Sequence, residues 1–258
     1  MERRSDARIM VMTHKKLGYA IPDNKLHQPI EIGAYFHNEP IWETRDNTGI
    51  SFSELNPILA EGTGILWARH NMPDTIKTLG HYQYRRWLPI DEDTDFDELF
   101  KTYNAILPMP YTLGATIKKQ YCNCHIPQTY DIMREIIFKD YPEFSKTWED
   151  RLDNGNILFY STAFVMPRQQ YNDCVDFLYE TSKKLCEALG GFTVNDIYKY
   201  TNDNCPKDRI NTYKERGYFY QAQIPIFFWE RLITLWVFNT FKTLDNIKLL
   251  PYTKMDGA

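Results

Sequence analysis

The stretch of sequence that decides the fold is Thr78-Leu79-Gly80-His81-Tyr82-Gln83-Tyr84-Arg85-Arg86-Trp87. It begins in a short apolar run, Ile76 to Gly80, which is typical of a buried strand, and continues into a histidine and two adjacent arginines. Ligands of open α/β sheets bind at the carboxyl ends of the strands. The forked guanidinium of arginine suits phosphate oxygens, and aromatic neighbours can hold a base or a sugar ring. The stretch therefore predicts an anion site at Arg85 and Arg86; two surface arginines on an exposed strand end are the alternative.

The composition limits the classes of protein to which the chain can belong. Its 258 residues, 43% of them hydrophobic, suffice for one substantial α/β domain. A formal net charge of -4 argues against a broad basic surface, and so against nucleic acid as a partner. Five cysteines at irregular spacings make no disulfide framework, and no apolar run is long enough to span a bilayer. We expect a cytoplasmic protein whose segment 242–254 is a candidate for peripheral contact with the inner face of the membrane.

Strand-like and helix-like segments alternate along the chain. Residues 8–13 are apolar and predict a buried first strand, whose tip would be Thr13-His14-Lys15. Asn56 is expected to be an N-cap, because Pro57 suits the first position of a helix. The other expected elements are a helix capped by Asp95, a strand at 104–107, helices at 128–139 and 143–152, a strand at 157–166, and helices at 167–190 and 226–241, with loops prevailing in 18–53 and 191–224. This alternation predicts an α/β fold with a mostly parallel central sheet flanked by helices.

Several short motifs follow one another in a characteristic order. They are Thr13-His14-Lys15, the helix that starts at Asn56-Pro57 and carries Glu61, Thr63 and Trp67, the strand ending in Tyr84-Arg85-Arg86, the strand 104–107, the segment 121–125 and Glu230-Arg231-Leu232. In this order they resemble the bacterial capsular and exopolysaccharide glycosyltransferase family long catalogued as a domain of unknown function, some members of which transfer galactofuranose. The family usually reads His-Tyr-Arg-Arg, whereas Gln83 stands in place of that histidine, and Ser161 stands where Asn is common.

The resemblance covers nearly the whole chain and implies a single GT-A-like nucleotide-binding domain over residues 1–258. Its nucleotide-binding part would be about 7–110, and its acceptor-side and C-terminal helical part about 111–258. The implied reaction is inverting transfer of a hexose, most plausibly galactofuranose from its UDP derivative, to an oligosaccharide or lipid-linked glycan acceptor of a capsular or other surface polysaccharide. The residues implied to bind the nucleotide sugar are Thr13, His14, Lys15, Asn56, His81, Tyr82, Gln83, Tyr84, Arg85 and Arg86, and those implied to be catalytic are His125, Glu230 and Glu61.

Positive side chains stand where many GT-A enzymes place an Asp-x-Asp motif for a metal. Arg85 and Arg86 can offset the charge of a leaving diphosphate, so we expect no required metal cofactor. Mg²⁺ or Mn²⁺ held by Asp91, Asp93 and Asp95 is the competing account, although a solvated acidic loop before a helix fits this pattern better. Zinc at the segment 122–125 is disfavoured because no second pair of cysteines or histidines accompanies it.

Other assignments stay open at this point. Glu230 lies in an apolar helix, where a carboxylate is costly unless it is paired, so it is either a structural anchor or a base with a raised pKa. His125 either donates to a diphosphate or an acceptor hydroxyl, or is a structural histidine. For the whole protein, the alternatives are transfer from another UDP-sugar and a non-catalytic sugar-binding or nucleotide-binding subunit of a capsule assembly complex.

Overall fold

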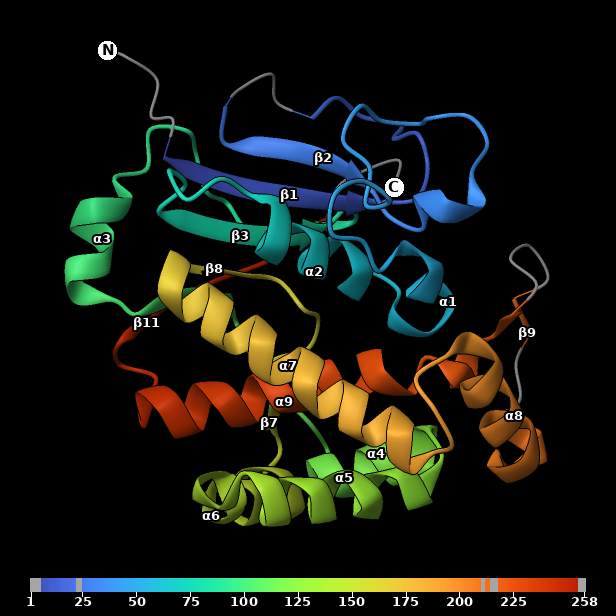
Figure 1. The fold of residues 1–258 in the computed structure, drawn as a ribbon. Coiled ribbons are helices and arrows are strands. Elements are labelled where there is room, and N and C mark those ends of the chain that lie inside the picture. Colours follow the sequence, from blue (N-terminus) through green and yellow to red (C-terminus); the bar gives the residue numbers. More distant parts are fainter. Residues whose placement is uncertain (1–5, 22–24, 210–211, 214–217, 255–258) are drawn as a thin grey trace.

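The computed structural model describes residues 6–21, 25–209, 212–213 and 218–254. A central sheet runs through the molecule in the order β11-β5-β8-β3-β1-β2, with β4 and β12 continuing it beside β3 (Figure 1). Its strands are β1 (Ala7–Thr13), β2 (His27–Glu31), β3 (Thr78–Gln83), β4 (Arg86–Trp87), β5 (Ala105–Pro108), β8 (Phe164–Pro167), β11 (Ile247–Leu250) and β12 (Thr253–Lys254). Two small ribbons pair β6 (Tyr111–Thr112) with β7 (Ile157–Leu158) and β9 (Thr212–Tyr213) with β10 (Tyr218–Phe219).

The strands on the long path of the sheet are parallel apart from one. β1 pairs in parallel with β2 and β3, and β11 pairs in parallel with β5. β8 lies between β3 and β5 and is antiparallel to both. The predicted α/β fold with a mostly parallel sheet is therefore confirmed, and the sheet takes strands from both 7–110 and 111–258.

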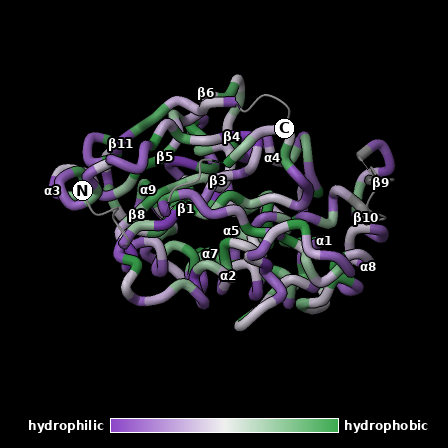
Figure 2. The backbone as a smooth tube through the Cα atoms, turned by 90° about the horizontal axis from the view of Figure 1, so that it is seen from above, coloured by the Kyte–Doolittle hydropathy of each residue, from purple (hydrophilic) through white to green (hydrophobic). Residues whose placement is uncertain are grey.

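Helices cover the sheet unequally. The larger hydrophobic core lies on the face where Met10, Leu79 and Phe164 meet α2, α7 and α9, and the smaller core on the other face includes Val11 and Phe96. The hydropathy colours follow this arrangement, because the central strands are mostly green and the periphery around α3 is purple (Figure 2). The helices are α1 (Asn56–Leu59), α2 (Gly62–Asn71), α3 (Phe96–Thr102), α4 (Ile117–Cys124), α5 (Pro127–Asp140), α6 (Ser145–Trp148), α7 (Arg168–Ala188), α8 (Val194–Asn204) and α9 (Ile224–Phe241).

Several predicted elements differ from the observed ones. The helix expected after Asn56 is broken into α1 and α2, because Ala60 adopts a positive φ of 44°. Asn56 is not the N-cap: it is the first residue of α1, and its side chain donates to the carbonyl of Ala60. The segment 191–224, expected to be rich in loops, contains α8. Residues 242–254, the candidate for membrane contact, contain β11 and β12, and that contact stays a prediction.

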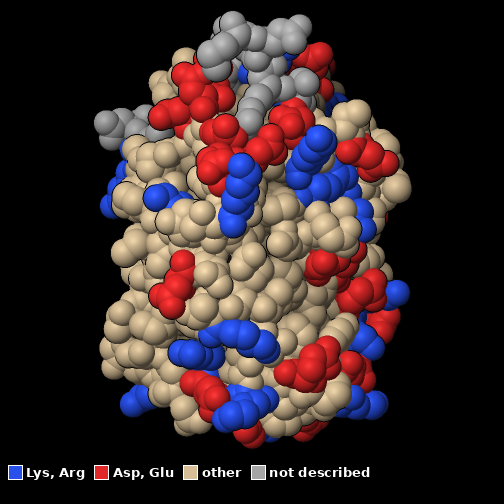
Figure 3. Space-filling model, turned by 90° about the vertical axis from the view of Figure 1, so that its left-hand side faces the viewer, with Lys and Arg blue, Asp and Glu red and all other residues tan. Residues whose placement is uncertain are grey.

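The acidic stretch before α3 lies away from the carboxyl ends of the strands. The side chain of Asp95 accepts a hydrogen bond from the Glu98 amide at 3.0 Å, so the predicted cap of this helix is confirmed. The face on the side of α3 carries acidic and basic side chains interspersed with uncharged surface (Figure 3). None of the described helices is both long enough and apolar enough to cross a membrane.

A buried carboxylate, Asp46, joins the loops that follow the strands. It is fully buried and accepts hydrogen bonds from the amides of Gly33 and Ala34, at 2.9 and 3.0 Å. It also accepts from the hydroxyls of Ser53 and Thr63, at 2.5 and 2.6 Å. One side chain therefore ties the segment after β2 to the turn before α1 and to α2.

Replacing this carboxylate tests its importance for the fold. Asp46→Asn should lower the free energy of unfolding by about 1–3 kcal/mol, because an amide nitrogen would face an N–H or hydroxyl donor that then lacks an acceptor. The measurement is urea unfolding followed by circular dichroism. The matched control is Asp176→Asn, which removes the charge of a half-exposed carboxylate paired with Arg69 and should cost less than about 1 kcal/mol. Equal losses for the two variants would contradict a central role for Asp46.

Candidate functional site

A cavity of about 680 Å³ lies at the carboxyl ends of β1 and β3, and we call it the arginine cavity. The break between α1 and α2, the end of α4 and the start of α9 complete its wall. Ten of the residues predicted from sequence line it: His14, Lys15, Asn56, Glu61, Gln83, Tyr84, Arg85, Arg86, His125 and Glu230. The fold thus brings together side chains that lie far apart in the sequence.

The two arginines occupy a tight hairpin. β3 ends at Gln83, and Arg86 pairs with it across the turn at the start of β4. The guanidinium of Arg86 lies 5.2 Å from the ring centre of Tyr160, and that of Arg85 lies 5.3 Å from the ring centre of Tyr84. Aromatic rings favour cations placed over their faces, so these contacts hold the arginines at the cavity.

Lys15 adds a third cation from the tip of β1. Its ammonium lies 5.1 Å from the ring centre of Tyr84, and the ring of His14 makes an edge contact with the same tyrosine at 5.3 Å between centroids. The fully buried hydroxyl of Thr13 donates to the carbonyl of Lys15 at 2.8 Å, which shapes this tip. Thr13 therefore positions the tip and does not line the cavity.

Glu61 is the first acid of the cavity. It directly follows Ala60, whose positive φ turns the chain between the two helices. Its Oε1 accepts from the Gln83 amide at 2.6 Å and from the Thr162 hydroxyl at 3.1 Å. Its Oε2 accepts no hydrogen bond from the residues that the structure describes. One oxygen is thus held in place while the other stays available to a ligand.

Glu230 on α9 is the second acid, and its side chain is 17% exposed. Its Oε1 accepts from the amide of Ser161 at 2.9 Å, and its Oε2 pairs with Arg231 at 2.7 Å. Burial raises the pKa of Glu230, and Arg231 and the Ser161 amide partly offset this rise. Both oxygens are occupied, which fits the structural anchor better than a free base.

Arg231 also lines the cavity, although the sequence shows it only as the middle residue of the motif Glu230-Arg231-Leu232. It is 1% exposed, and besides Glu230 it donates to the carbonyl of Phe227 and to the side chain of Gln120. A buried arginine needs such partners, since an unpaired charge in the interior is costly. An arginine inside the most apolar helix of the sequence was the signal that could have identified it.

Two strained backbone positions lie directly beside the two acids. Ala60 has a φ of 44° and precedes Glu61, whereas Ser161 has a φ of 83° and donates its amide to Glu230. Such conformations cost free energy in residues other than glycine. They persist where the surrounding structure enforces them, often at functional sites. Both strained positions thus lie next to an acid of the cavity in the chain or in a hydrogen bond.

His125 closes the cavity at the end of α4. Its ring stacks on Phe227 with centroids 4.0 Å apart, and its Nδ1 lies 3.3 Å from Oε1 of Gln221. It is 7% exposed and lines the arginine cavity. Its predicted catalytic role stays a prediction.

The structure does not bring His81 and Tyr82 into the cavity, which corrects their placement among the nucleotide-sugar ligands. Both side chains are fully buried in the sheet. The two ring nitrogens of His81 contact the carbonyl of Thr162 and the hydroxyl of Tyr171, and burial lowers the pKa of His81 to about 3. A neutral, enclosed histidine of this kind is part of the core.

The aspartates considered for metal binding are not part of the cavity either. Asp91, Asp93 and Asp95 are absent from its wall, and Asp95 is engaged as a helix cap. Among the described residues, no three or more His, Cys, Asp or Glu side chains form a group that could hold a metal ion.

Comparisons with known proteins place the chain in a family. No curated protein matches it in sequence. It is similar in structure to the apo form of WbbM, a bifunctional glycosyltransferase, with a TM-score of 0.74 and 18% identical residues over 97% of this chain and 45% of that one. At this identity the likeness is one of fold, and the chain spans less than half the length of WbbM. The family described as a domain of unknown function (DUF4422) matches residues 8–189, well over half of the sequence. The chain therefore belongs to the DUF4422 family.

Proposed function

We propose that this protein is a glycosyltransferase that moves a hexose, galactofuranose from its UDP derivative, onto a capsular or other surface polysaccharide. The observation that carries the proposal is the arginine cavity, in which Arg85 and Arg86 share one space with Glu61 and Glu230. Glycosyl transfer needs positive charge for a leaving diphosphate and a base for the acceptor hydroxyl. The bifunctional glycosyltransferase activity in the name of WbbM supports the reaction class, and the choice of galactofuranose rests on the motif resemblance.

The proposed reaction is a single displacement. An acceptor hydroxyl oxygen attacks the anomeric carbon, the bond from that carbon to the phosphate oxygen breaks, and its electron pair leaves with UDP. The hydroxyl proton passes to Oε2 of Glu61. Arg85, Arg86 and Lys15 offset the charge that develops on the diphosphate. Attack from the face opposite the leaving group inverts the anomeric configuration.

Release of UDP from a panel of UDP-sugars tests this function. UDP-galactofuranose, with a surface-polysaccharide oligosaccharide as acceptor, should give the fastest release. Faster release from another UDP-sugar would keep the reaction class and change the donor. Binding of UDP without turnover of any donor would instead favour a non-catalytic binding subunit.

The arginines should matter for turnover and little for stability. Arg85→Ala or Arg86→Ala should lower kcat about 10²–10³-fold, the scale of removing one positioned donor to a developing negative charge. Initial rates of UDP release measure this loss, and circular dichroism verifies that the variants fold. Lys16→Ala is the matched control, because it removes an exposed cation beside Lys15 that does not line the cavity. Turnover at the normal rate in both arginine variants would remove the pair from the site.

Glu61 should act as the base and Glu230 as the anchor. Glu61→Gln should lower kcat about 10²–10⁴-fold, the range of general base catalysis, while leaving UDP affinity close to normal. Glu230→Gln keeps the shape of the side chain, so its effect should fall mainly on thermal stability, because Arg231 would lose its ionised partner. The reverse pattern, with kcat lost only in Glu230→Gln, would assign the base to Glu230.

Transfer should not strictly need a divalent ion, because the cations of the arginine cavity take the place of a metal. UDP release should therefore continue in excess EDTA at a rate similar to that measured with added Mg²⁺ or Mn²⁺. Abolition by EDTA with full rescue by Mn²⁺, together with an inactive Asp93→Ala variant, would contradict this mechanism and support the acidic stretch as the metal site.

A further inference from the structure

A second cavity adjoins the arginine cavity, and neither of the two acids Glu61 and Glu230 lines it. Its volume is about 1050 Å³. His14, Ile32 and Asn56 line both cavities, so the two spaces are neighbours. A transferase must bring two substrates together, and the two adjoining spaces offer one place for each.

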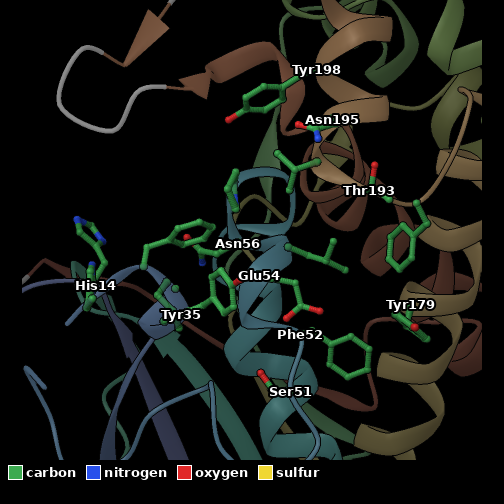
Figure 4. Close-up of a pocket in the computed structure, with 18 residues that line it drawn as sticks. His14, Tyr35, Ser51, Phe52, Glu54, Asn56, Tyr179, Thr193, Asn195 and Tyr198 are labelled. Atoms are coloured by element: carbon green, nitrogen blue, oxygen red, sulfur yellow. The ribbon is translucent and has the colours of Figure 1, made fainter. Parts of the chain in front are cut away.

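Aromatic rings from distant parts of the chain face this second space, which we call the aromatic cavity. Tyr35 and Phe36, after β2, are 64% and 55% exposed and pack edge to face at 5.1 Å. Across from them lie Tyr179 on α7 and Tyr198 on α8 (Figure 4). Large aromatic rings left exposed beside a cavity are typical of a binding surface, because they present flat apolar faces with polar edges.

Polar side chains lie among these rings. Asn195 on α8 and Glu54 between the strands and α1 both line the aromatic cavity and are exposed (Figure 4). At its base, the rings of Phe52 and Tyr179 contact each other with centroids 5.1 Å apart, which joins the two walls. Stacking faces with a few hydrogen-bonding groups match the alternating apolar faces and hydroxyls of sugar rings.

Charge divides the two cavities sharply. Lys15, Arg85, Arg86 and Arg231 line the arginine cavity. Among the described residues that line the aromatic cavity there is no lysine or arginine, and Glu54 contributes a negative charge. A diphosphate is therefore favoured in the first space and disfavoured in the second, whereas a neutral ligand meets no electrostatic repulsion in the second.

We propose that the aromatic cavity binds the acceptor as a neutral oligosaccharide, with its sugar rings stacked on Tyr35 and Tyr198 and its reacting hydroxyl directed past Asn56 into the arginine cavity. The proposal rests on the proposed transferase function and names the class of its second substrate. Pockets of about 300–1,000 Å³ enclose ligands of drug size, so this volume accommodates more than one sugar ring. Tyr35 and Tyr198 are then specificity-determining residues for the acceptor.

A glycan array of neutral oligosaccharides, each two to six sugars long, tests this proposal. Binding of the full chain to the array is measured in the presence of UDP. Wild-type protein should bind members of the array. Tyr35→Ala and Tyr198→Ala should each weaken that binding about three- to tenfold, the scale of one aromatic contact. Ile50→Ala is the matched control, because it removes an exposed apolar side chain that lines neither cavity. UDP affinity, measured by calorimetry, should be the same in all four proteins.

Each other outcome overturns the proposal in a distinct way. Failure of the wild-type protein to bind any neutral oligosaccharide, or equal binding by Tyr198→Ala, would remove the aromatic cavity as an acceptor site. A fall in UDP affinity in the tyrosine variants would assign the cavity to the nucleoside. Retention on vesicles of anionic phospholipid that depends on Tyr35, without glycan binding, would assign it to a membrane. In all these cases UDP release that depends on Arg85 would persist if the transferase function is correct, so the two failures are distinguishable.

Discussion

The site depends first on the hydrogen bonds that converge on the buried carboxylate of Asp46. A buried charge is tolerated only when donors surround it, and four donors from three loop and helix segments converge on this one. The same segments form the shared wall of the two cavities. Gly33, one of the donors, has a φ of 68°, a conformation that side chains rarely adopt, and a Cβ on it would lie 2.7 Å from Oδ1 of Asn56. Asn56 itself is held at the junction by its hydrogen bonds to the Ala60 carbonyl and the Thr63 hydroxyl.

Cationic and acidic side chains line the same arginine cavity. The cations stand on the β1 and β3 side with Arg231 opposite, and the acids are tied to amides, hydroxyls and Arg231. The exposed guanidinium of Arg85 has no anionic partner among the described residues, so the cavity favours an anionic ligand over an uncharged one. A diphosphate would complete the balance while leaving the acids on the acceptor side. Ala60 and Ser161, beside the two acids, adopt positive φ values, which are costly for residues other than glycine.

Local patterns predicted much of the fold and many cavity residues. The apolar run of β1, the Asp95 cap and the tip Thr13-His14-Lys15 depend on neighbouring residues, which a sequence displays directly. The arginines were predicted for the same reason, because they directly follow a strand.

What the sequence did not disclose depends on distant contacts. His81 looked like a ligand because it stands close to the arginines, yet strand alternation and the antiparallel β8 enclose it. Asp46 gave no local signal, since its four donors come from residues 33, 34, 53 and 63. The break at Ala60 is enforced by tertiary structure against the helical tendency of alanine. The aromatic cavity, and the place of Arg231 in the wall of the arginine cavity, likewise depend on the packing of α8 and α9 against the first half of the chain.

The central claim is that the arginine cavity receives the diphosphate of a nucleotide sugar. A crystal structure of the protein in complex with UDP tests it most directly. The account predicts phosphate oxygens within hydrogen-bonding distance of the guanidinium groups of Arg85 and Arg86, with Glu61 facing the space beyond the terminal phosphate. UDP bound with its phosphates outside this cavity, and with no contact to either arginine, would contradict the account.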